Sequence, residues 1–294
     1  MKIKNTQELA KNPLRRAALR IIESGLAAID TKEIVKRTVH LSQNILRVLG
    51  QTFDLRKYKK IYVVGVGKCA IDAASALEKI LGPRLAGGMV IDIRPTSRLK
   101  KIKAYLGFHP APNEKNVDAT KKLVNLLKSL KRSDLVICIV SGGGSTILCS
   151  PHDLTCVQEG AILQELSRAG ADIKQINTVR KHISYARGGF LAKHAYPAKV
   201  FSLIFSDVAG DNLDYVASGP TFRDTTSVKE AERILAKYDI LKKCALNGCK
   251  LIETPKDIKY FANVDNILLA TNKPALEAMK KSAEALGFSS LIKN

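Results

Sequence analysis

The feature that most constrains this chain is a series of short, continuously apolar runs separated by longer segments with helical periodicity. The runs predict β-strands at 61–66, 89–93, 104–108, 135–140, 200–205 and 267–270. Runs this short and this apolar are typical of strands that are covered on both faces of a sheet. The segments between them predict helices at 68–81, 117–130, 154–168, 172–183, 228–238 and 274–286. This alternation favours βαβ units and a mostly parallel sheet.

The two ends of the chain add to this pattern. Apolar residues at helical spacing predict two helices before the first strand, at 9–29 and 32–49. At the other end, residues 288–294 resemble the start of a further strand. The expected fold class is therefore α/β, a Rossmann-like three-layer α/β/α arrangement with a mostly parallel sheet, preceded by two N-terminal helices. We treat 1–294 as one domain, because 46% apolar residues in 294 can bury a sizeable core.

The strongly basic composition raises the question of a polyanionic partner. The formal charge is +21, from 48 Lys and Arg against 27 Asp and Glu. The basic clusters are short and scattered, the chain has no Trp and only 5% aromatic residues, and it carries no nucleic-acid-binding motif. We therefore expect no nucleic-acid partner. A basic crevice would suit a nucleotide, or a small carboxylate or phosphate substrate, equally well.

The N-terminal residues and the cysteine usage are consistent with an intracellular protein. No run of about 18 apolar residues is present, and the first residues resemble no signal peptide. We expect a cytoplasmic protein with no membrane partner. The six cysteines show no CxxC spacing, which favours reduced thiols over a zinc site or disulfides.

Two glycine-rich loops follow predicted strands. The segment 65–70, with Gly65 and Gly67, opens a helix, so its backbone amides could hold an anion. It also satisfies the weak dinucleotide pattern GxGxx(G/A), although Asp92 lies late for the acidic residue that such a site needs. The second loop, 141–146, could cradle a phosphate because glycines allow a close backbone approach. For both loops the alternative is a tight strand-to-helix turn, and neither matches a P-loop.

The strand at 200–205 ends in acidic residues, which makes its carboxyl end a candidate site. Asp207 and Asp211 could ligate magnesium or accept a proton from a hydroxyl; the alternative is that they cap the next turn. On the helix 172–183, Asn177, Arg180 and Lys181 offer an amide and two cations, with a solvated helix face as the alternative. We interpret His109 as a packed turn residue.

These motifs resemble the N-terminal domain of the class II glycerate kinases, whose second, C-terminal domain is called MOFRL. The segments that carry the resemblance span nearly the whole chain: 65–68, 109–110, 141–145, 176–182, 206–211 and 218–221. Each motif is modest alone, but their order and spacing are specific. The resemblance implies ATP-dependent phosphorylation of D-glycerate, usually to 2-phosphoglycerate. Some relatives carry an older label of hydroxypyruvate reductase.

The resemblance also implies roles for individual residues. Lys68 would stabilise phosphoryl oxygens or hold the substrate, and Asp207 would activate the glycerate hydroxyl or anchor Mg²⁺, with Asp211 supporting the metal. The remaining candidates would bind ATP or D-glycerate: Gly65, Gly67, Ser141, Gly142, Gly143, Gly144, Ser145, Asn177, Arg180, Lys181, Ser218 and Gly219. Among them, Arg180 and Lys181 would neutralise a carboxylate or phosphate. Phosphoryl transfer depends mainly on positioning and charge stabilisation, which suits this set.

Two departures from the family pattern affect these expectations. Family members commonly have Asp where this chain has Asn113. The MOFRL domain is expected to be absent, which leaves open a split gene, a separately encoded MOFRL partner or a truncated sequence. We expect the isolated chain to fold but to phosphorylate glycerate poorly. An NAD(P)H-dependent hydroxypyruvate reductase, a non-catalytic nucleotide-binding remnant and assembly into a homo-oligomer also stay open.

Overall fold

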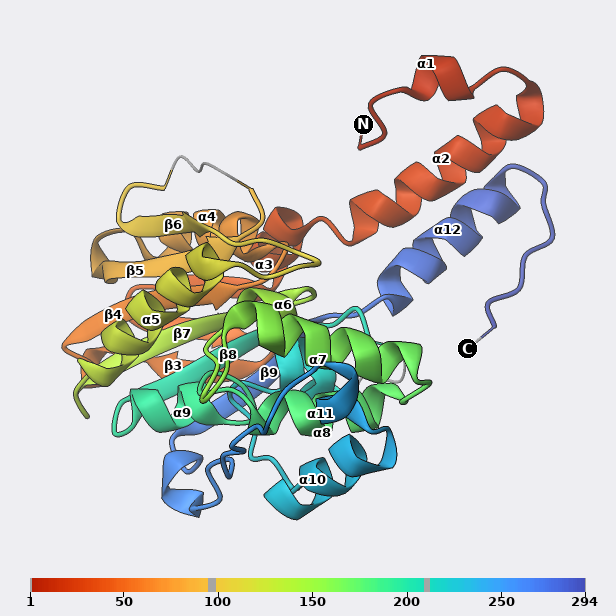
Figure 1. Ribbon diagram of the computed structural model, residues 1–294. Helices are drawn as coiled ribbons and strands as arrows, with labels where there is room; N and C mark the ends of the chain where they lie inside the picture. Colours follow the sequence, from red (N-terminus) through yellow and green to blue (C-terminus); the bar gives the residue numbers. More distant parts are fainter. Residues whose placement is uncertain (1, 95–98, 209–211, 294) are drawn as a thin grey trace.

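The computed structural model describes residues 2–94, 99–208 and 212–293, which form an α/β body and a projecting helical arm (Figure 1). In the described part, six strands form one parallel sheet in the order β6-β5-β4-β7-β8-β9. The strands are β4 (Lys60–Val66), β5 (Leu85–Asp92), β6 (Ile102–Leu106), β7 (Asp134–Ser141), β8 (Lys199–Phe205) and β9 (Val264–Ala270). The predicted α/β class and all six predicted strands are confirmed.

Both faces of the sheet are covered, which explains why its strands are apolar throughout. All eight residues of β7 are buried. Along β4, Ile61 and Val63 face one core and Val64 and Val66 the other, because side chains alternate across a strand. The first core lies under α3 (Thr31–Thr38) and α4 (Ala70–Leu81), and the second under α5 (Glu114–Lys128) and α9 (Phe190–Ala195).

A further group of helices packs beside the second face around its own apolar cluster. It comprises α7 (Cys156–Arg168), α8 (Ile173–His182), α10 (Val228–Lys237) and α11 (Ile240–Lys243). Local sequence explains where three of these helices begin. Capping boxes pair Thr155 with Gln158, Asp172 with Gln175, and Ser227 with Glu230, which satisfies the first free amides of α7, α8 and α10.

The N-terminal region differs from the two helices that the sequence predicts. Pro13 begins a new helix, so 9–29 is divided between α1 (Thr6–Leu9) and α2 (Pro13–Ala28). The predicted helix 32–49 is wrong beyond Thr38. There the chain forms an antiparallel sheet of β1 (Val39–Ser42), β2 (Ile45–Val48) and β3 (Gln51–Asp54). The reason is tertiary: residues 45–48 pair with β1 on one side and with β3 on the other, and Leu46 and Val48, on one face of the strand, enter the same core.

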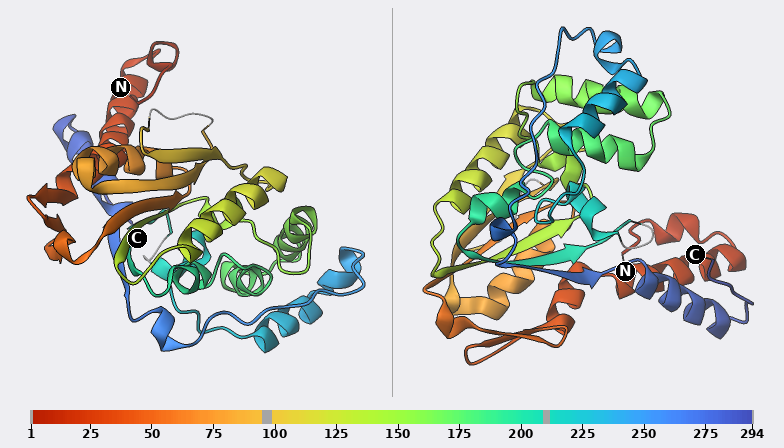
Figure 2. Two further views of the ribbon diagram at one scale, coloured as in Figure 1. Left: turned by 90° about the vertical axis from the view of Figure 1, so that its left-hand side faces the viewer. Right: turned by 90° about the horizontal axis from the view of Figure 1, so that it is seen from below.

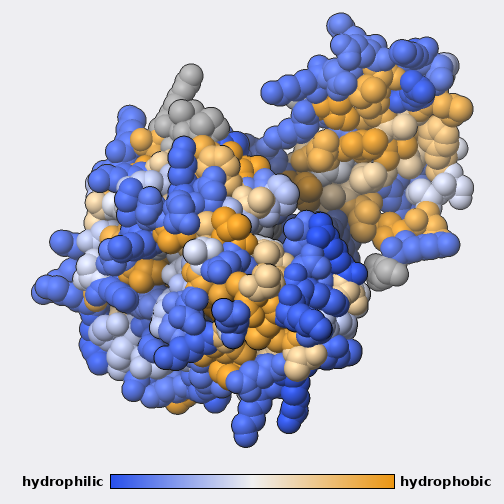
Figure 3. Space-filling model, viewed as in Figure 1, coloured by the Kyte–Doolittle hydropathy of each residue, from blue (hydrophilic) through white to orange (hydrophobic). Residues whose placement is uncertain are grey.

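The arm consists of α1, α2 and α12 (Lys273–Ala285), and both chain termini lie on it (Figures 1 and 2). Helices α2 and α12 pack closely, since a Cβ on Gly25 would lie only 2.6 Å from the Met279 side chain. Apolar side chains remain on the arm surface (Figure 3), with Leu14 70% and Leu291 78% exposed. The strand expected at 288–294 is not formed, because residues 288–293 pair with no described strand.

Short elements complete the described chain: α6 (Gly144–Ile147) and the 3-10 helices η1 (Leu55–Lys57), η2 (Gly82–Arg84), η4 (Leu213–Ser218) and η5 (Ile258–Tyr260). None of the helices in the described ranges combines the length and apolar character needed to cross a membrane. The strand order has a functional consequence. From the adjacent strands β4 and β7 the chain proceeds toward opposite edges of the sheet, and such a switch point leaves a crevice outside the strand carboxyl ends.

Candidate active site

The two glycine loops at the switch point are bonded directly to each other. Lys68 N donates to Gly142 O at 3.0 Å, and Cys69 N donates to Ser141 Oγ at 3.4 Å. Gly67 permits this approach: its φ is +119°, and a Cβ there would lie 2.1 Å from Ser141 Oγ. Any side chain at Gly67 would therefore push the loops apart.

The first loop does not present a free helix N-terminus. The buried carboxylate of Asp92 accepts a hydrogen bond from Ile71 N at 3.0 Å, in the first turn of α4, and Arg94 binds the same carboxylate at 2.8 Å. The anion site expected there is thus filled by the protein's own carboxylate. Gly65 lies within β4, where a Cβ would come 3.0 Å from the side chain of Ile139. Its role in this structure is close strand packing.

Three polar side chains, those of Lys68, His109 and Asp207, converge on the second loop. A Cβ on Gly142 would lie 2.0 Å from Asp207 Oδ2, so the glycine makes room for that carboxylate. Gly143 has φ +80°, and a Cβ there would lie 2.9 Å from Lys68 Cε and 3.3 Å from His109 Cδ2. Lys68, His109 and Asp207 therefore surround one glycine-rich turn, and His109 is exposed there rather than packed into the turn as the sequence suggested.

Two cavities lie on either side of Asp207. The first, about 200 Å³, is lined by Lys68, Cys69, Ser141, Thr31, Thr271 and Asn272, among others. The second, about 180 Å³, is lined by Gly143, Ser145, Asn177, Arg180, Tyr215 and Ala217, among others. Gly142 and Asp207 line both. The carboxylate at the end of β8 thus stands where two small binding spaces meet.

A polar network forms the wall of the second cavity. Ser218 Oγ donates to Asn177 Oδ1 at 3.0 Å and lies 3.0 Å from Ser145 Oγ. Arg180 Nη1 donates to the same Asn177 oxygen at 3.0 Å. Ala217 and Ser218 have φ values of 53° and 59°, a conformation that costs about 1 kcal/mol or more per non-glycine residue and often occurs at functional sites. The structure thus links Asn177 and Arg180, which the sequence placed on one helix, with Ser145 and Ser218 from two other candidate segments.

Close packing behind this wall explains Gly144, the third glycine of the second loop. A Cβ on Gly144 would lie 2.5 Å from the Cβ of Ala217. Gly144 therefore lets η4 sit directly on the second loop, and its role is to allow that contact.

The electrostatic environment of the cleft differs between its two sides. Burial, together with the charge of Arg187, lowers the pKa of Arg180 to about 10. Although His109 is largely exposed, partial burial of its ring and the neighbouring Lys68 ammonium hold its pKa below its usual value, while the charge of Asp207 opposes this effect. With a pKa of about 10, Arg180 remains a cation at pH 7.

Lys181 is not part of the cleft, which corrects its predicted role. Its ammonium is buried and pairs with Asp224 at 3.1 Å and Asp214 at 3.5 Å, so it has no freedom to neutralise a ligand. Gly219 has φ +59°, and a Cβ there would lie 2.7 Å from Asp214 O, so it shapes the turn after η4. Asp211, predicted as a metal ligand, lies outside the described residues.

Several cleft residues were missed from the sequence. Thr31 comes from the start of α3, and Thr271 and Asn272 lie between β9 and α12. Tyr215 comes from η4. None belongs to a glycine or charge motif, so no local signal marks them. They reach the cleft only because distant segments meet at the same sheet edge.

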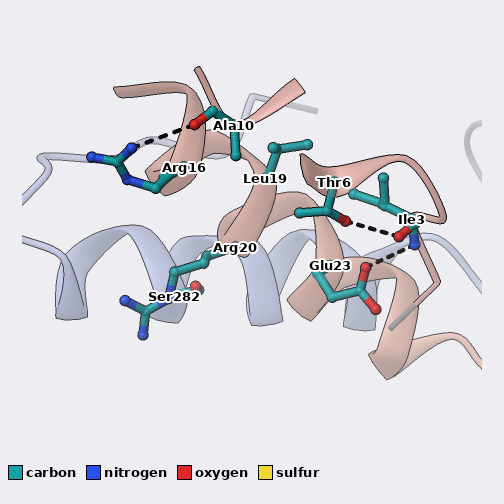
Figure 4. A pocket seen from close by; sticks show the side chains of 8 residues that line it. All are labelled: Ile3, Thr6, Ala10, Arg16, Leu19, Arg20, Glu23 and Ser282. Carbon is teal, nitrogen blue, oxygen red and sulfur yellow. Dashed lines mark hydrogen bonds between the residues drawn. The ribbon is translucent and has the colours of Figure 1, made fainter. Parts of the chain in front are cut away.

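A larger cavity, about 550 Å³, lies on the arm and is distinct from this cleft (Figure 4). The hydrogen bonds drawn along its wall are internal to the N-terminal segment: Arg16 Nη1 to Ala10 O, Thr6 Oγ1 to Ile3 O, and Ile3 N to Glu23 Oε2. No strand-end loop contributes to it. We therefore do not assign it a role in catalysis.

Metal-binding capacity is limited in the part of the chain that the structure describes. It contains no group of three or more His, Cys, Asp or Glu side chains that could hold an ion. Asp207 is the carboxylate that lines both cavities. This donor set suits Mg²⁺ coordinated mainly by phosphates and water, which often needs only one or two protein carboxylates.

Comparison with known proteins places the chain in a family. The model of a family described as "Domain of unknown function (DUF4147)" matches residues 17–252. A glycerate 2-kinase from Pyrococcus horikoshii is 36% identical over 290 residues, which covers 95% of this chain and 64% of that protein. A protein from Agrobacterium vitis with a provisional hydroxypyruvate reductase name is 36% identical over 237 residues, covering 78% of this chain and 53% of that protein.

A solved structure extends the similarity to the fold. The crystal structure of a glycerate kinase from Thermotoga maritima matches with a TM-score of 0.75 and 30% identity, covering 94% of this chain and 63% of that one. This chain thus spans less than two thirds of the length of these glycerate kinases. Because the family model matches most of the sequence, from the first long helix to the segment after α11, the chain belongs to the DUF4147 family.

Proposed function

We propose that this chain takes part in glycerate kinase chemistry, transferring the γ-phosphoryl group of ATP to D-glycerate to give 2-phosphoglycerate. The observation that supports this most is the position of Asp207 and Gly142 between two cavities, with Lys68 on one side and Arg180 on the other. A two-substrate transfer needs two adjoining binding spaces and a group at their junction that handles charge. The names of the glycerate kinase relatives support the substrate class.

The mechanism assigns each side of the cleft by its chemistry. Arg180 would bind the glycerate carboxylate in the cavity of about 180 Å³ that Ser145 also lines, a volume that suits a three-carbon acid. Lys68 and the amides of the second glycine loop would stabilise phosphate oxygens on the other side. Asp207 would accept the proton of the attacking hydroxyl. Protein groups then supply mainly position and charge, as phosphoryl transfer requires.

Asp207 is also the residue that would hold Mg²⁺ together with the nucleotide phosphates. When bound, the ion would supply neutralisation of phosphate charge. The protein's own contribution is to pack the carboxylate of Asp207 directly against Gly142, so that the carboxylate cannot move closer to the loop. Asp211, outside the described residues, stays a candidate second ligand.

The reductase alternative is less well supported by the first glycine loop. A dinucleotide-binding loop would offer a helix N-terminus to the pyrophosphate. In this chain Asp92 already accepts the hydrogen bond from Ile71 N at that place. A pyrophosphate would have to displace a buried carboxylate that Arg94 also binds.

The direct test is product formation by the purified chain. It is incubated with ATP, Mg²⁺ and D-glycerate, alone and with an added MOFRL domain, and the two phosphoglycerate isomers are distinguished by ³¹P NMR. Formation of 2-phosphoglycerate in either arm supports the proposal. NAD(P)H oxidation with hydroxypyruvate and no phosphoglycerate would favour the reductase. ATP binding without either product would favour a nucleotide-binding remnant.

Asp207→Asn sharpens this test. Removing the proton acceptor should lower the transfer rate by about 10²- to 10⁴-fold, as loss of a general base does. The matched control is Asp265→Asn. Asp265 pairs with Lys199 at 2.8 Å near the opposite, amino-terminal end of β8, so transfer should stay within about twofold of wild type. Equal loss in both variants would argue against a role for Asp207 in the reaction.

The compartment follows from the same proposal. All six cysteines are free thiols in the structure. This supports our placing the reaction in the reducing cytoplasm, where disulfides are rare.

A further inference from the structure

A buried ion pair lies close to the Arg180 side of the cleft, and the proposed reaction does not use it. Arg187 Nη2 and Glu159 Oε1 are 2.6 Å apart, and the two side chains are 0% and 1% exposed. Glu159 comes from α7, and Arg187 follows the end of α8. Neither residue lines the cavity of about 180 Å³.

The pair is incompletely satisfied. Arg187 Nε and Nη1 are buried and have no hydrogen-bond partner among the residues that the structure describes, and near Glu159 there is only the weakly donating thiol of Cys149 besides Arg187. Nε of Arg180 likewise has no hydrogen-bond partner among the described residues. Buried charged groups are normally bonded at nearly every polar atom, so this cluster is exceptional. With two guanidinium groups and one carboxylate, it retains one net positive charge.

Glu159 and Arg187 act on Arg180 in opposite directions. The charge of Arg187 repels the Arg180 guanidinium, and that of Glu159 attracts it. Arg180 is held by its hydrogen bond to Asn177 Oδ1, an oxygen that also accepts from Ser218. Its guanidinium therefore lies in the wall of the cavity rather than in a bond to Glu159.

We propose that Arg187 is a positioning residue: by occupying Glu159, it leaves Arg180 available to bind the carboxylate of a small hydroxy acid in the cavity. This deepens the proposed function and rests on it for the identity of the acid. Without a cation at position 187, the carboxylate of Glu159 would be left with Arg180 as its counter-ion. Arg180 would then turn from the cavity toward α7, and the ligand would lose its charged partner.

The size of the cavity favours this class of ligand. A volume of about 180 Å³ is below the range of roughly 300–1,000 Å³ that is usual for larger ligands. The hydroxyl group of Ser145, which is bonded to Ser218, lines the same cavity as a further polar group. A carboxylate with a neighbouring hydroxyl matches these groups.

The test measures binding of D-glycerate by calorimetry to four forms of the full chain: wild type, Arg187→Met, Arg187→Lys and the double variant Glu159→Gln/Arg187→Met. We expect Arg187→Met to bind at least about tenfold more weakly, because charged partners are lost. Arg187→Lys keeps the positive charge, and the double variant removes the competing carboxylate. Both should bind within about threefold of wild type.

The rescue separates positioning from a merely structural role. If the pair only supports the fold, the double variant should bind no better than Arg187→Met, and that result would overturn the inference. Thermal unfolding of each form shows whether it is folded at the temperature of the titration. If Arg187→Met does not fold, the Arg187→Lys and double variants still decide, since a tenfold loss in either contradicts the proposal.

Failure of this inference can be distinguished from failure of the proposed function. The expected binding pattern without formation of phosphoglycerate would disprove the kinase assignment alone. Transfer activity with unchanged binding in Arg187→Met would disprove the positioning role alone. A wild-type chain that binds no D-glycerate would overturn this inference whatever the transfer assay shows.

Discussion

Arg180 and Lys181 are adjacent cations on α8, yet they enter opposite surroundings. Lys181 points into a buried cluster around Asp224, whose carboxylate also accepts from Thr226 Oγ1 at 2.8 Å and Thr254 Oγ1 at 3.0 Å. Arg180 lines the cavity beside Asp207 and has a buried Nε without a described partner. Lys181 thus belongs to a network whose hydrogen bonds are made, and Arg180 belongs to one that has unfilled donors.

This difference separates a structural charge from a candidate binding charge. A buried ion pair with all its hydrogen bonds made has nothing left to offer a ligand. A cluster with unfilled donors and a net charge favours an anion that fills them. Neighbouring positions on a helix point about 100° apart, so the two cations could not both face the cleft. The comparison leads to three predictions.

The largest effect is expected from breaking the Asp224 cluster. Asp224→Asn leaves the buried ammonium of Lys181 without its main partner and should lower the free energy of unfolding by about 3–5 kcal/mol. Chemical denaturation measures this change. Asp265→Asn, at a half-buried pair with Lys199, serves as the control and should stay within about 0.5 kcal/mol of wild type. A loss below about 1 kcal/mol in Asp224→Asn would contradict the structural role of the cluster.

A smaller effect, on binding rather than stability, is expected from Arg180→Gln. Loss of a charged hydrogen-bond donor should weaken D-glycerate binding by about 10- to 100-fold. The free energy of unfolding should change by less than about 1 kcal/mol, because removal of one of two like charges relieves repulsion by Arg187. Lys181→Met is the matched control with the reverse result: lower stability and, where folded, unchanged binding. Identical profiles for the two variants would refute the comparison.

The smallest effect concerns pH. Although burial alone would raise the pKa of Asp224, the charge of Lys181 and the bonds from Thr226 bring it below its usual value. A carboxylate with a lowered folded pKa stabilises the protein above its unfolded pKa of about 3.9, and this contribution is lost as pH falls through the folded pKa. The stability gap between wild type and Asp224→Asn should therefore narrow below about pH 4. A gap that widens in acid would contradict this.

Much of the fold could be predicted because its signals are local. The six apolar runs became the six strands of the sheet, and the strand-end loops at 65–70 and 141–146 lie at the switch point. The segment 39–48 was mispredicted, since a short apolar pattern fits both a helix and a hairpin. Its pairing with residues 51–54 decided between them.

The candidate site was predictable in its members but not in their arrangement. The sequence by itself determined which glycines, cations and carboxylates lie at strand and helix ends, because residue type and periodicity act over a few residues. Only the tertiary structure decided that Asp92 binds the N-terminus of α4, that Lys181 binds Asp224 and that Arg180 faces the cleft. The physical reason is that a charge acts on whatever packing brings within a few ångströms, and such neighbours come from distant parts of the chain.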